Sequence, residues 1–431
     1  MTDSSLRSRI HRVIADEPVV DMHTHLYPPA FGTPFTGKAD TPDPNGLMLW
    51  GIDALLTYHY LIAEVFRVVP ATILSYDAFW SMTIAQQADH IWKHLFTDRL
   101  PVSEACRGVL TTLASLGLDP NEQDLNKHRQ WFAEQSPNDY TDLVMQKANV
   151  KSITMTNNPF DPNERQRWLD NPSVADDPRF SPVLRIDELL TRPDLAAETL
   201  NPLGYNFDPS LPETSLNEAR RFLSDWIQRI RPIYLAASLP PTFTYDDPSA
   251  VTRRMLDKAV LPLCREHDLP FAMMIGTIRQ INPSLHSAGD TLGKANALAI
   301  ANLCADNPQN RFLATLLSRE SQHELCVTAR KIGKLTPFGC WWFLNNPSII
   351  TEITTQRLEL LGTTFIPQHS DARVLDQLIY KWSHSRTLIA EALTKQLQAI
   401  EHTGYQITDE MIHAEARRLL SGNFLQTLAQ H

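Results

Sequence analysis

Eight short apolar stretches rich in β-forming residues recur along the chain, and most are separated by segments with a helical pattern. They cover residues 19–23, 150–156, 180–186, 232–238, 270–276, 311–317, 338–343 and 363–368. Strands that alternate with helices favour an α/β fold with a parallel sheet. Eight such units predict closure into a (β/α)8 TIM-type barrel, and an open doubly wound sheet is the alternative.

One connection is far longer than the others. Residues 46–148, between the first two predicted strands, contain helical patterns such as "IDALLTYHYLIAEVFRVV". We therefore predict one barrel domain over 1–431, with 46–148 as a mostly helical insertion that covers the mouth. Barrel enzymes place their active sites at the C-terminal ends of the strands, so the residues found there are the candidates for function.

Two histidines, His23 and His25, end the first predicted strand in "VVDMHTH". Alternate side chains of a strand point the same way, so both imidazoles can bind one divalent metal ion. The alternative is a hydrogen-bonding pair near a turn. Asp371, after the eighth strand, can complete the metal site because strands one and eight are neighbours in a closed barrel. Its alternative role is to cap a helix.

Charged residues follow two other predicted strands. Arg185, after the third strand, is a candidate anion clamp, and Asp187 beside it can orient it or pair with it. Arg373 could make a forked contact with a substrate carboxylate, and a surface position is its alternative.

Aromatic residues supply further candidates. Trp341 and Trp342 are adjacent, so one of them faces the barrel axis, where it could form a wall against a sugar; core packing is the alternative. His59 and Tyr60 lie in the predicted insertion and reach the site only if the insertion covers the mouth.

Charge and cysteine content argue against several classes. The chain has 39 basic and 49 acidic residues, a net charge of −10, which disfavours non-specific nucleic-acid binding. Its five cysteines form no CxxC pair, so a reducing cytoplasm is expected. We expect no signal peptide and no membrane span, because no long apolar stretch is present.

Six segments resemble the uronate isomerase branch of the amidohydrolase superfamily. They are "VVDMHTH", "TYHYLIAEVFR", "VLRID", "IGTIRQIN", "FGCWWFLNN" and "HSDAR", in the same order from residue 19 to about 390. The resemblance implies a barrel of the metal-dependent amidohydrolase kind. It also implies an intramolecular oxidoreductase that isomerises an aldehydic hexuronate, for example glucuronate to fructuronate.

The same resemblance implies roles for individual residues. His23, His25 and Asp371 would bind a divalent metal, with zinc expected. Asp371 would also move a proton, Tyr60 would be the second acid–base group, and Arg373 would act with them. The implied substrate-binding residues are Arg185, Asp187, His59, Trp341, Trp342 and Arg279. The expected partner is a small acidic sugar, with no nucleic acid and no membrane, and a homo-oligomer is the expected assembly.

The chain departs from the family pattern at three strand ends. After Thr156, Asn157 and Asn158 stand where the family has two carboxylates, and "AASLPP" replaces an Asp-His pair. Met274 replaces a histidine, and Met cannot serve as a hard-metal ligand or proton carrier. Two other functions stay open: a metal-dependent hydrolase of an ester, lactone or amide, and a non-catalytic binding protein.

Overall fold

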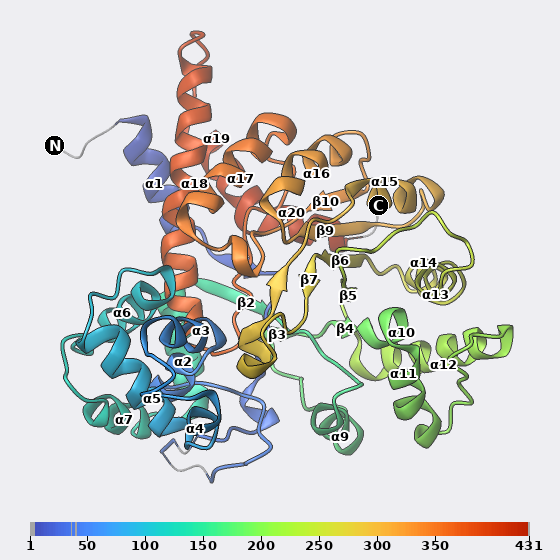
Figure 1. Cartoon of the computed structure of the whole chain (residues 1–431). Coiled ribbons are helices and arrows are strands. Elements are labelled where there is room, and N and C mark those ends of the chain that lie inside the picture. The colour runs from blue at the N-terminus through green and yellow to red at the C-terminus, as the bar shows by residue number, and fades with distance from the viewer. Residues whose placement is uncertain (1–4, 36, 39–40, 430–431) are drawn as a thin grey trace.

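Parallel strands form the centre of the computed structural model, which describes residues 5–35, 37–38 and 41–429 (Figure 1). The strands pair in two groups, β1–β2–β3 and β4–β5–β6–β9–β10. Their bounds are β1 Val19–Asp21, β2 Val150–Thr154, β3 Phe180–Ser181, β4 Leu184–Arg185, β5 Leu235–Leu239, β6 Phe271–Ile275, β9 Phe312–Leu316 and β10 Leu335–Pro337.

Backbone pairing joins the two groups into a closed ring. We call each of the eight strand positions around the barrel a stave. β3 and β4 together form one stave, and the chain just after β2 makes a parallel bridge to β4. On the other side, Phe338 after β10 bridges Ile366 in parallel. Asp371, further along that stave, donates its N–H to the carbonyl of His23 at 3.2 Å. The chain around Ile366 to Asp371 is therefore the eighth stave, next to β1. The predicted (β/α)8 barrel is confirmed, and the open doubly wound sheet is wrong.

The last two predicted strands differ in detail from the structure. The seventh strand is β10, so residues 338–343 follow the strand, and Trp342–Leu344 forms the 3-10 turn η7. The prediction placed this strand too late because aromatic residues favour strands through their packing on buried surfaces, which this loop also provides. The eighth stave is irregular, because only Ile366 of residues 363–368 makes a β-bridge. A hairpin of β7 (Thr277–Ile278) and β8 (Thr291–Leu292) was not predicted.

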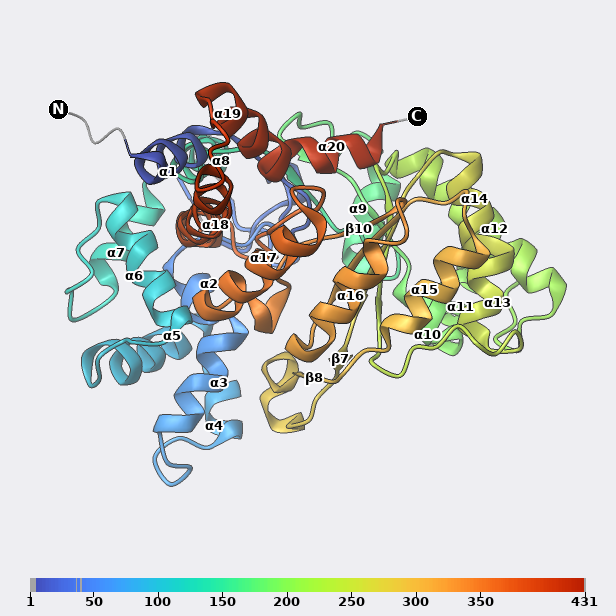
Figure 2. The same ribbon diagram turned by 90° about the horizontal axis from the view of Figure 1, so that it is seen from above.

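The connection between β1 and β2 is mostly helical and lies to one side of the strands (Figure 2). Side-chain caps begin several of its helices; Thr83 and Gln86, for example, form a reciprocal capping box. The predicted domain limits, 1–431 with an insertion over 46–148, stay a prediction, and both chain ends lie outside the described residues. The helices are α2 Ile52–Leu56, α3 His59–Val68, α4 Tyr76–Trp80, α5 Ile84–Trp92, α6 Glu104–Leu116, α7 Asn126–Ala133 and α8 Pro137–Ala148.

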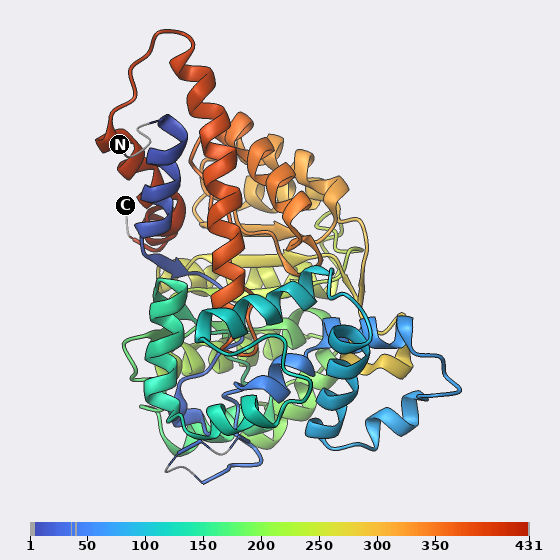
Figure 3. The same cartoon turned by 90° about the vertical axis from the view of Figure 1, so that its left-hand side faces the viewer.

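The remaining helices surround the strands, and the long α18 runs along one side of the molecule beside α1 (Figure 3). In the part of the chain that the structure describes, no helix combines the length and the apolar character needed to cross a membrane. The bounds are α1 Leu6–Asp16, α9 Pro162–Asp170, α10 Asp187–Thr191, α11 Pro193–Leu200, α12 Glu213–Ile230, α13 Val251–Met255, α14 Leu261–Glu266, α15 Ala297–Asp306, α16 Gln322–Ala329, α17 Pro347–Leu361, α18 Gln377–Glu401, α19 Asp409–Arg417 and α20 Asn423–Leu428.

Two layers of apolar packing hold the barrel together. Strands β6 and β9 are buried at every residue, as expected for strands with packed side chains on both faces. The inner cluster draws one or two side chains from most staves, among them Met22, Ala272 and Leu313. Phe424 of α20 joins this cluster against the ring of Tyr234, 6.2 Å away between ring centres. The barrel interior is therefore packed with side chains. The open cavity lies at the end of the barrel away from α20.

Candidate functional site

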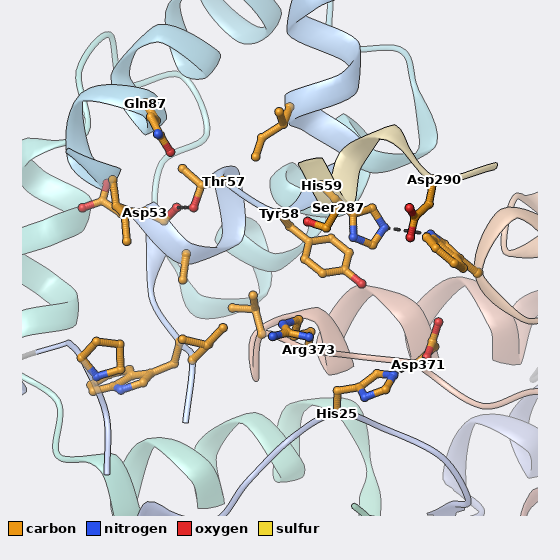
Figure 4. A pocket seen from close by; sticks show the side chains of 18 of the residues that line it. His25, Asp53, Thr57, Tyr58, His59, Gln87, Ser287, Asp290, Asp371 and Arg373 are labelled. Carbon is orange, nitrogen blue, oxygen red and sulfur yellow. Dashed lines mark hydrogen bonds and ion pairs between the residues drawn. The ribbon is translucent and has the colours of Figure 1, made fainter. Parts of the chain in front are cut away.

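A cavity of about 620 Å³ opens where the barrel strands end and the helices of the β1–β2 connection come over them (Figure 4). This is the end of the barrel at which enzymes of this fold carry their active sites. The lining includes most of the residues predicted from the sequence, which come together from distant positions: His23, His25, His59, Arg185, Arg279, Trp341, Trp342, Asp371 and Arg373. Two predicted residues, Tyr60 and Asp187, do not line it.

Three side chains in this cavity can hold one metal ion. One ligand atom from each of His23, His25 and Asp371 lies within 4.8 Å of the others. Asp371 Oδ1 is 3.6 Å from His23 Nε2 and 3.4 Å from His25 Nε2. The two histidines follow β1 with one residue between them, so strand alternation places both on the cavity side, as the sequence predicts.

The hydrogen bonds of His23 leave its metal-facing nitrogen free. Thr156 donates its hydroxyl proton to the carbonyl of Thr24 at 2.8 Å, so its oxygen can only accept from His23 Nδ1, 3.4 Å away. This assigns the proton of the neutral imidazole to Nδ1 and leaves the Nε2 lone pair toward Asp371. His23 Nε2 and Asp371 Oδ1 are both buried and have no hydrogen-bond partner among the described residues. These two atoms are both acceptors, so neither can donate a hydrogen bond to the other. A cation bound between them would satisfy both.

Asp371 is held in a conformation and a charge state suited to this site. Its φ of +51° is uncommon for a residue other than glycine, and such strain occurs where the surrounding structure holds a functional side chain. Burial alone raises the pKa of Asp371. The imidazoles of His25, His23 and His369 outweigh that effect and bring this pKa well below its usual value. Burial lowers the pKa of His23 and of His25, so both are neutral ligands at neutral pH.

A second carboxylate, Asp21, ties the two ligand-bearing staves together. Its Oδ1 accepts the N–H of His23 at 3.4 Å and the N–H of Ser370 at 3.2 Å. Its Oδ2 accepts the indole N–H of Trp382 at 2.8 Å. Burial raises the pKa of Asp21 to about 6. Asp21 therefore fixes the position of β1 against the stave that carries Asp371. We did not predict this role, although the "VVD" that precedes the histidines was a signal.

Two arginines approach the cavity from different staves. Arg185 on β4 pairs through Nε with Asp187 Oδ2 at 2.9 Å, and its pKa is raised by this pairing despite burial. The other oxygen of Asp187 accepts the N–H of Ser238 at 2.8 Å. Asp187 thus orients Arg185 and has both oxygens engaged, which argues against the direct substrate contact predicted for it. Arg373 is exposed to the cavity, and its guanidinium makes no hydrogen bond or ion pair with the described residues.

The "YHY" segment at the start of α3 reaches the cavity through its first two residues. Tyr58 and His59 line it, and their rings lie 4.0 Å apart between centres (Figure 4). Tyr58 is the extended residue that precedes α3, and Tyr60 lies in the first turn of the helix with its ring centre 5.3 Å from that of Tyr58. Tyr60 therefore packs against Tyr58 and does not itself line the cavity. Burial raises the pKa of Tyr60, and the neighbouring Tyr58 and Asp371 raise it further, so its phenol keeps its proton at neutral pH.

The aromatic wall and the rim complete the site. Trp341 and Trp342 both line the cavity and are nearly fully buried, so the sequence expectation that one would face it understates their role. Arg279 stands at the rim with 60% of its side chain exposed and pairs with Asp290 at 2.6 Å. Met274 and Ser238 line the wall where the family pattern has ionisable groups.

A third histidine beside the metal ligands was missed. His369 is fully buried, its ring centre lies 5.3 Å from that of His23, and neither of its ring nitrogens has a partner among the described residues. Gly339 allows this approach, because a Cβ there would come within 1.8 Å of His369 Nδ1. The spacing "HSD" was the available signal, since it repeats the alternation of the first histidine pair.

The whole chain is similar to solved structures of uronate isomerases. One from Bacillus halodurans C-125 is 46% identical, with 99% of this chain and 96% of that one covered and a TM-score of 0.91. Two more distant structures share the fold. A uronate isomerase from Thermotoga maritima is 14% identical, with 98% of this chain and 97% of that one covered and a TM-score of 0.75. A glucuronate isomerase from Caulobacter crescentus is 15% identical, with 100% of this chain and 96% of that one covered and a TM-score of 0.73. No protein-family model and no curated protein matches the chain.

Proposed function

Because the chain belongs to the uronate isomerase family, we propose that it converts an aldehydic hexuronate of the glucuronate or galacturonate kind into its keto isomer. The observation that carries this function is the 46% identity over 99% of the chain to a uronate isomerase. The hydrolase alternative has no comparable support. A non-catalytic binding role does not account for the buried, unpaired acceptor atoms of His23 and Asp371.

The reaction needs one carbon-bound proton and one hydroxyl proton to move. The C2 proton leaves to give an enediolate and returns at C1, while the O2 proton is transferred to O1, so no further reactant is consumed. We assign the carbon proton to Asp371, whose lowered pKa keeps it ionised at neutral pH. Its Oδ1 faces the two histidines, which leaves Oδ2 for the proton transfer.

The donor set suits a divalent metal, and we propose zinc. His23, His25 and Asp371 would hold the ion, since two imidazoles and one carboxylate are common zinc ligands and leave coordination positions open. When bound, the ion supplies Lewis-acid stabilisation of negative charge on the substrate oxygens. The protein's own contribution is to fix these ligands through Thr156 and Asp21.

Arg373 and Arg185 should hold the substrate carboxylate, so Arg373→Lys and Arg185→Lys should each weaken binding of an acidic sugar. Lysine offers no planar fork to a carboxylate. Loss of a charge-assisted hydrogen bond costs on the order of 1.5–3 kcal/mol, so affinity should fall about ten- to a hundred-fold. Calorimetry with a non-reactive hexonate measures this change.

Arg279→Lys is the matched comparison, because Arg279 has an exposed side chain and already pairs with the buried carboxylate of Asp290 at 2.6 Å. If the rim variant weakens binding as strongly as the other two, the carboxylate lies at the rim. If none of the three weakens it, the arginines do not bind the substrate.

We propose Tyr60 as the second acid–base group, with Tyr58 as a substrate contact. Tyr60→Phe should then lower kcat by roughly 10²–10⁴-fold, the range for a general acid–base residue. Tyr58→Phe should mainly raise KM, because Tyr58 lines the cavity. Steady-state kinetics of the two variants separates these effects. A larger kcat loss in Tyr58→Phe would transfer the proton role to Tyr58.

The proposed activity is tested by incubating the metal-loaded protein with glucuronate and galacturonate in deuterated water. Formation of the keto sugar, with deuterium at C1 or C2 of recovered sugar, is expected for proton-transfer isomerisation. Parallel reactions with lactones and esters test the hydrolase alternative. If these are cleaved while no uronate is turned over or exchanged, the isomerase proposal fails.

Two further expectations from the sequence are carried as proposals. We propose that the protein works in the cytoplasm, since its five cysteines are all buried as free thiols. We also propose a homo-oligomer, which light scattering of the purified protein tests directly.

A further inference from the structure

A hydrogen bond joins the aromatic wall of the cavity to the imidazole of α3. Trp342 Nε1 lies 2.8 Å from His59 Nε2, and the two rings meet edge to face with centres 5.4 Å apart. An indole N–H can only donate, so His59 Nε2 must accept with its lone pair. A neutral His59 that accepts at Nε2 carries its proton on Nδ1.

The backbone of Trp342 is strained in a way that supports a specific purpose for this contact. Its φ is +46°, and a bulky side chain in the left-handed region is a true outlier. The indole is stacked on Phe343, with ring centres 4.5 Å apart and planes 15° from parallel. Strain of this kind persists where the surroundings fix a side chain for function. Here the fixed feature is the direction of the indole N–H.

The surroundings of His59 favour its neutral form. Burial is the main cause that lowers its pKa, to about 3. The charge of Asp371 raises this pKa, whereas Lys381, Arg373 and His25 lower it further.

Uncharged rings complete the surroundings of His59. The phenols of Tyr58, just before α3, and Tyr60, within it, flank the imidazole with ring centres 4.0 and 4.2 Å away. His59 lines the cavity, and its Nδ1 makes no hydrogen bond with the described residues (Figure 4).

We propose that Trp342 is a positioning residue that holds His59 in the Nδ1-protonated tautomer, so that this imidazole donates a hydrogen bond to a substrate oxygen. The inference rests on the proposed isomerase function for the identity of that oxygen, a hydroxyl or carbonyl of the acidic sugar. His59 is then a fixed donor that selects an acceptor at one carbon, and it takes no proton during the reaction. Trp342 acts on the substrate through His59, in addition to lining the cavity.

The tautomer is measured without any substrate. Long-range ¹H–¹⁵N spectra of protein with ¹⁵N-labelled histidine distinguish a protonated from an unprotonated ring nitrogen, and the His59 signals are assigned by their absence in His59→Gln. We expect Nδ1–H in the wild type and a mixture of tautomers in Trp342→Phe, which lacks the donor. Trp341→Phe, which removes the neighbouring indole, should leave the His59 tautomer unchanged.

A second pair of variants keeps the proposal testable if Trp342→Phe folds poorly. The amide of His59→Asn can place an N–H near the position of Nδ1, whereas that of His59→Gln reaches toward Nε2. We expect the KM for the uronate to be about two- to tenfold lower in His59→Asn than in His59→Gln. This ratio is the effect of one neutral hydrogen bond that only the Asn amide can make.

Three outcomes would overturn the proposal: Nε2–H in the wild type, an unchanged tautomer in a folded Trp342→Phe, or a KM order reversed between the two His59 variants. The spectra do not depend on turnover, so a failure of the isomerase activity remains distinguishable from a failure of the tautomer assignment.

Discussion

Replacement of Asp371 by Asn should lower kcat by roughly 10²–10⁴-fold while a hexuronate still binds, because Asn cannot accept the C2 proton. The arginines proposed to hold the substrate carboxylate are untouched by the change. Binding of a non-reactive hexonate should therefore fall far less than kcat. Solvent deuterium should also fail to enter the recovered sugar, since exchange at C2 depends on the same carboxylate.

Asp290→Asn is the matched control for this experiment. It removes a carboxylate from the rim of the same cavity, where Asp290 pairs with Arg279, and should reduce kcat much less. Metal content must be measured in both variants, because Asp371 is also a proposed ligand. An Asp371→Asn enzyme that keeps its metal and loses less than about tenfold in kcat would exclude Asp371 as the proton carrier.

His23→Ala should lose the divalent metal and, with it, all measurable isomerase activity. The variant leaves two of the three protein ligands, too few for the site proposed here. Thr156→Val keeps the ligand and removes only the hydroxyl that faces His23 Nδ1, so it should weaken metal affinity by about 10–100-fold. Metal affinity should therefore be highest in the wild type, lower in Thr156→Val and lowest in His23→Ala.

Titration calorimetry with zinc and elemental analysis of protein purified without chelator measure this order. The folded state should also gain thermal stability as metal is added to the wild type, because a ligand that binds the native state raises its apparent stability. His23→Ala should lack this gain. A His23→Ala protein that binds zinc as tightly as the wild type would remove the cluster as the metal site.

The changed strand ends limit how far the family pattern describes this cavity. Met274 and Ser238 line it, while Asn157 is engaged in a hydrogen bond to Glu164 at 2.8 Å. Asn157 therefore serves the fold, and its partner Glu164 does not line the cavity. The proposed chemistry then rests chiefly on Asp371 and the arginines, which line the cavity, whereas Tyr60, the proposed second acid–base group, does not line it.

Local patterns in the sequence predicted the barrel and the metal cluster. Apolar runs between helical segments placed six of the eight barrel strands within a few residues of their observed positions. Strand alternation placed His23 and His25 on one face, and ring closure placed Asp371 beside them. These features follow from rules that act over a few residues, periodicity and strand order, so they are contained in the sequence itself.

Only the tertiary structure decided which of the remaining residues reach the cavity and what they contact. Trp342 donates to His59 across 283 residues of sequence, and Trp382 donates to Asp21 across 361. The start of α3 at His59 brings Tyr58 into the cavity lining and keeps Tyr60 out of it. The late aromatic run misled the placement of the seventh strand, because a buried loop and a strand offer aromatic side chains similar packing. Such contacts depend on how whole elements pack against one another, and no local pattern encodes that.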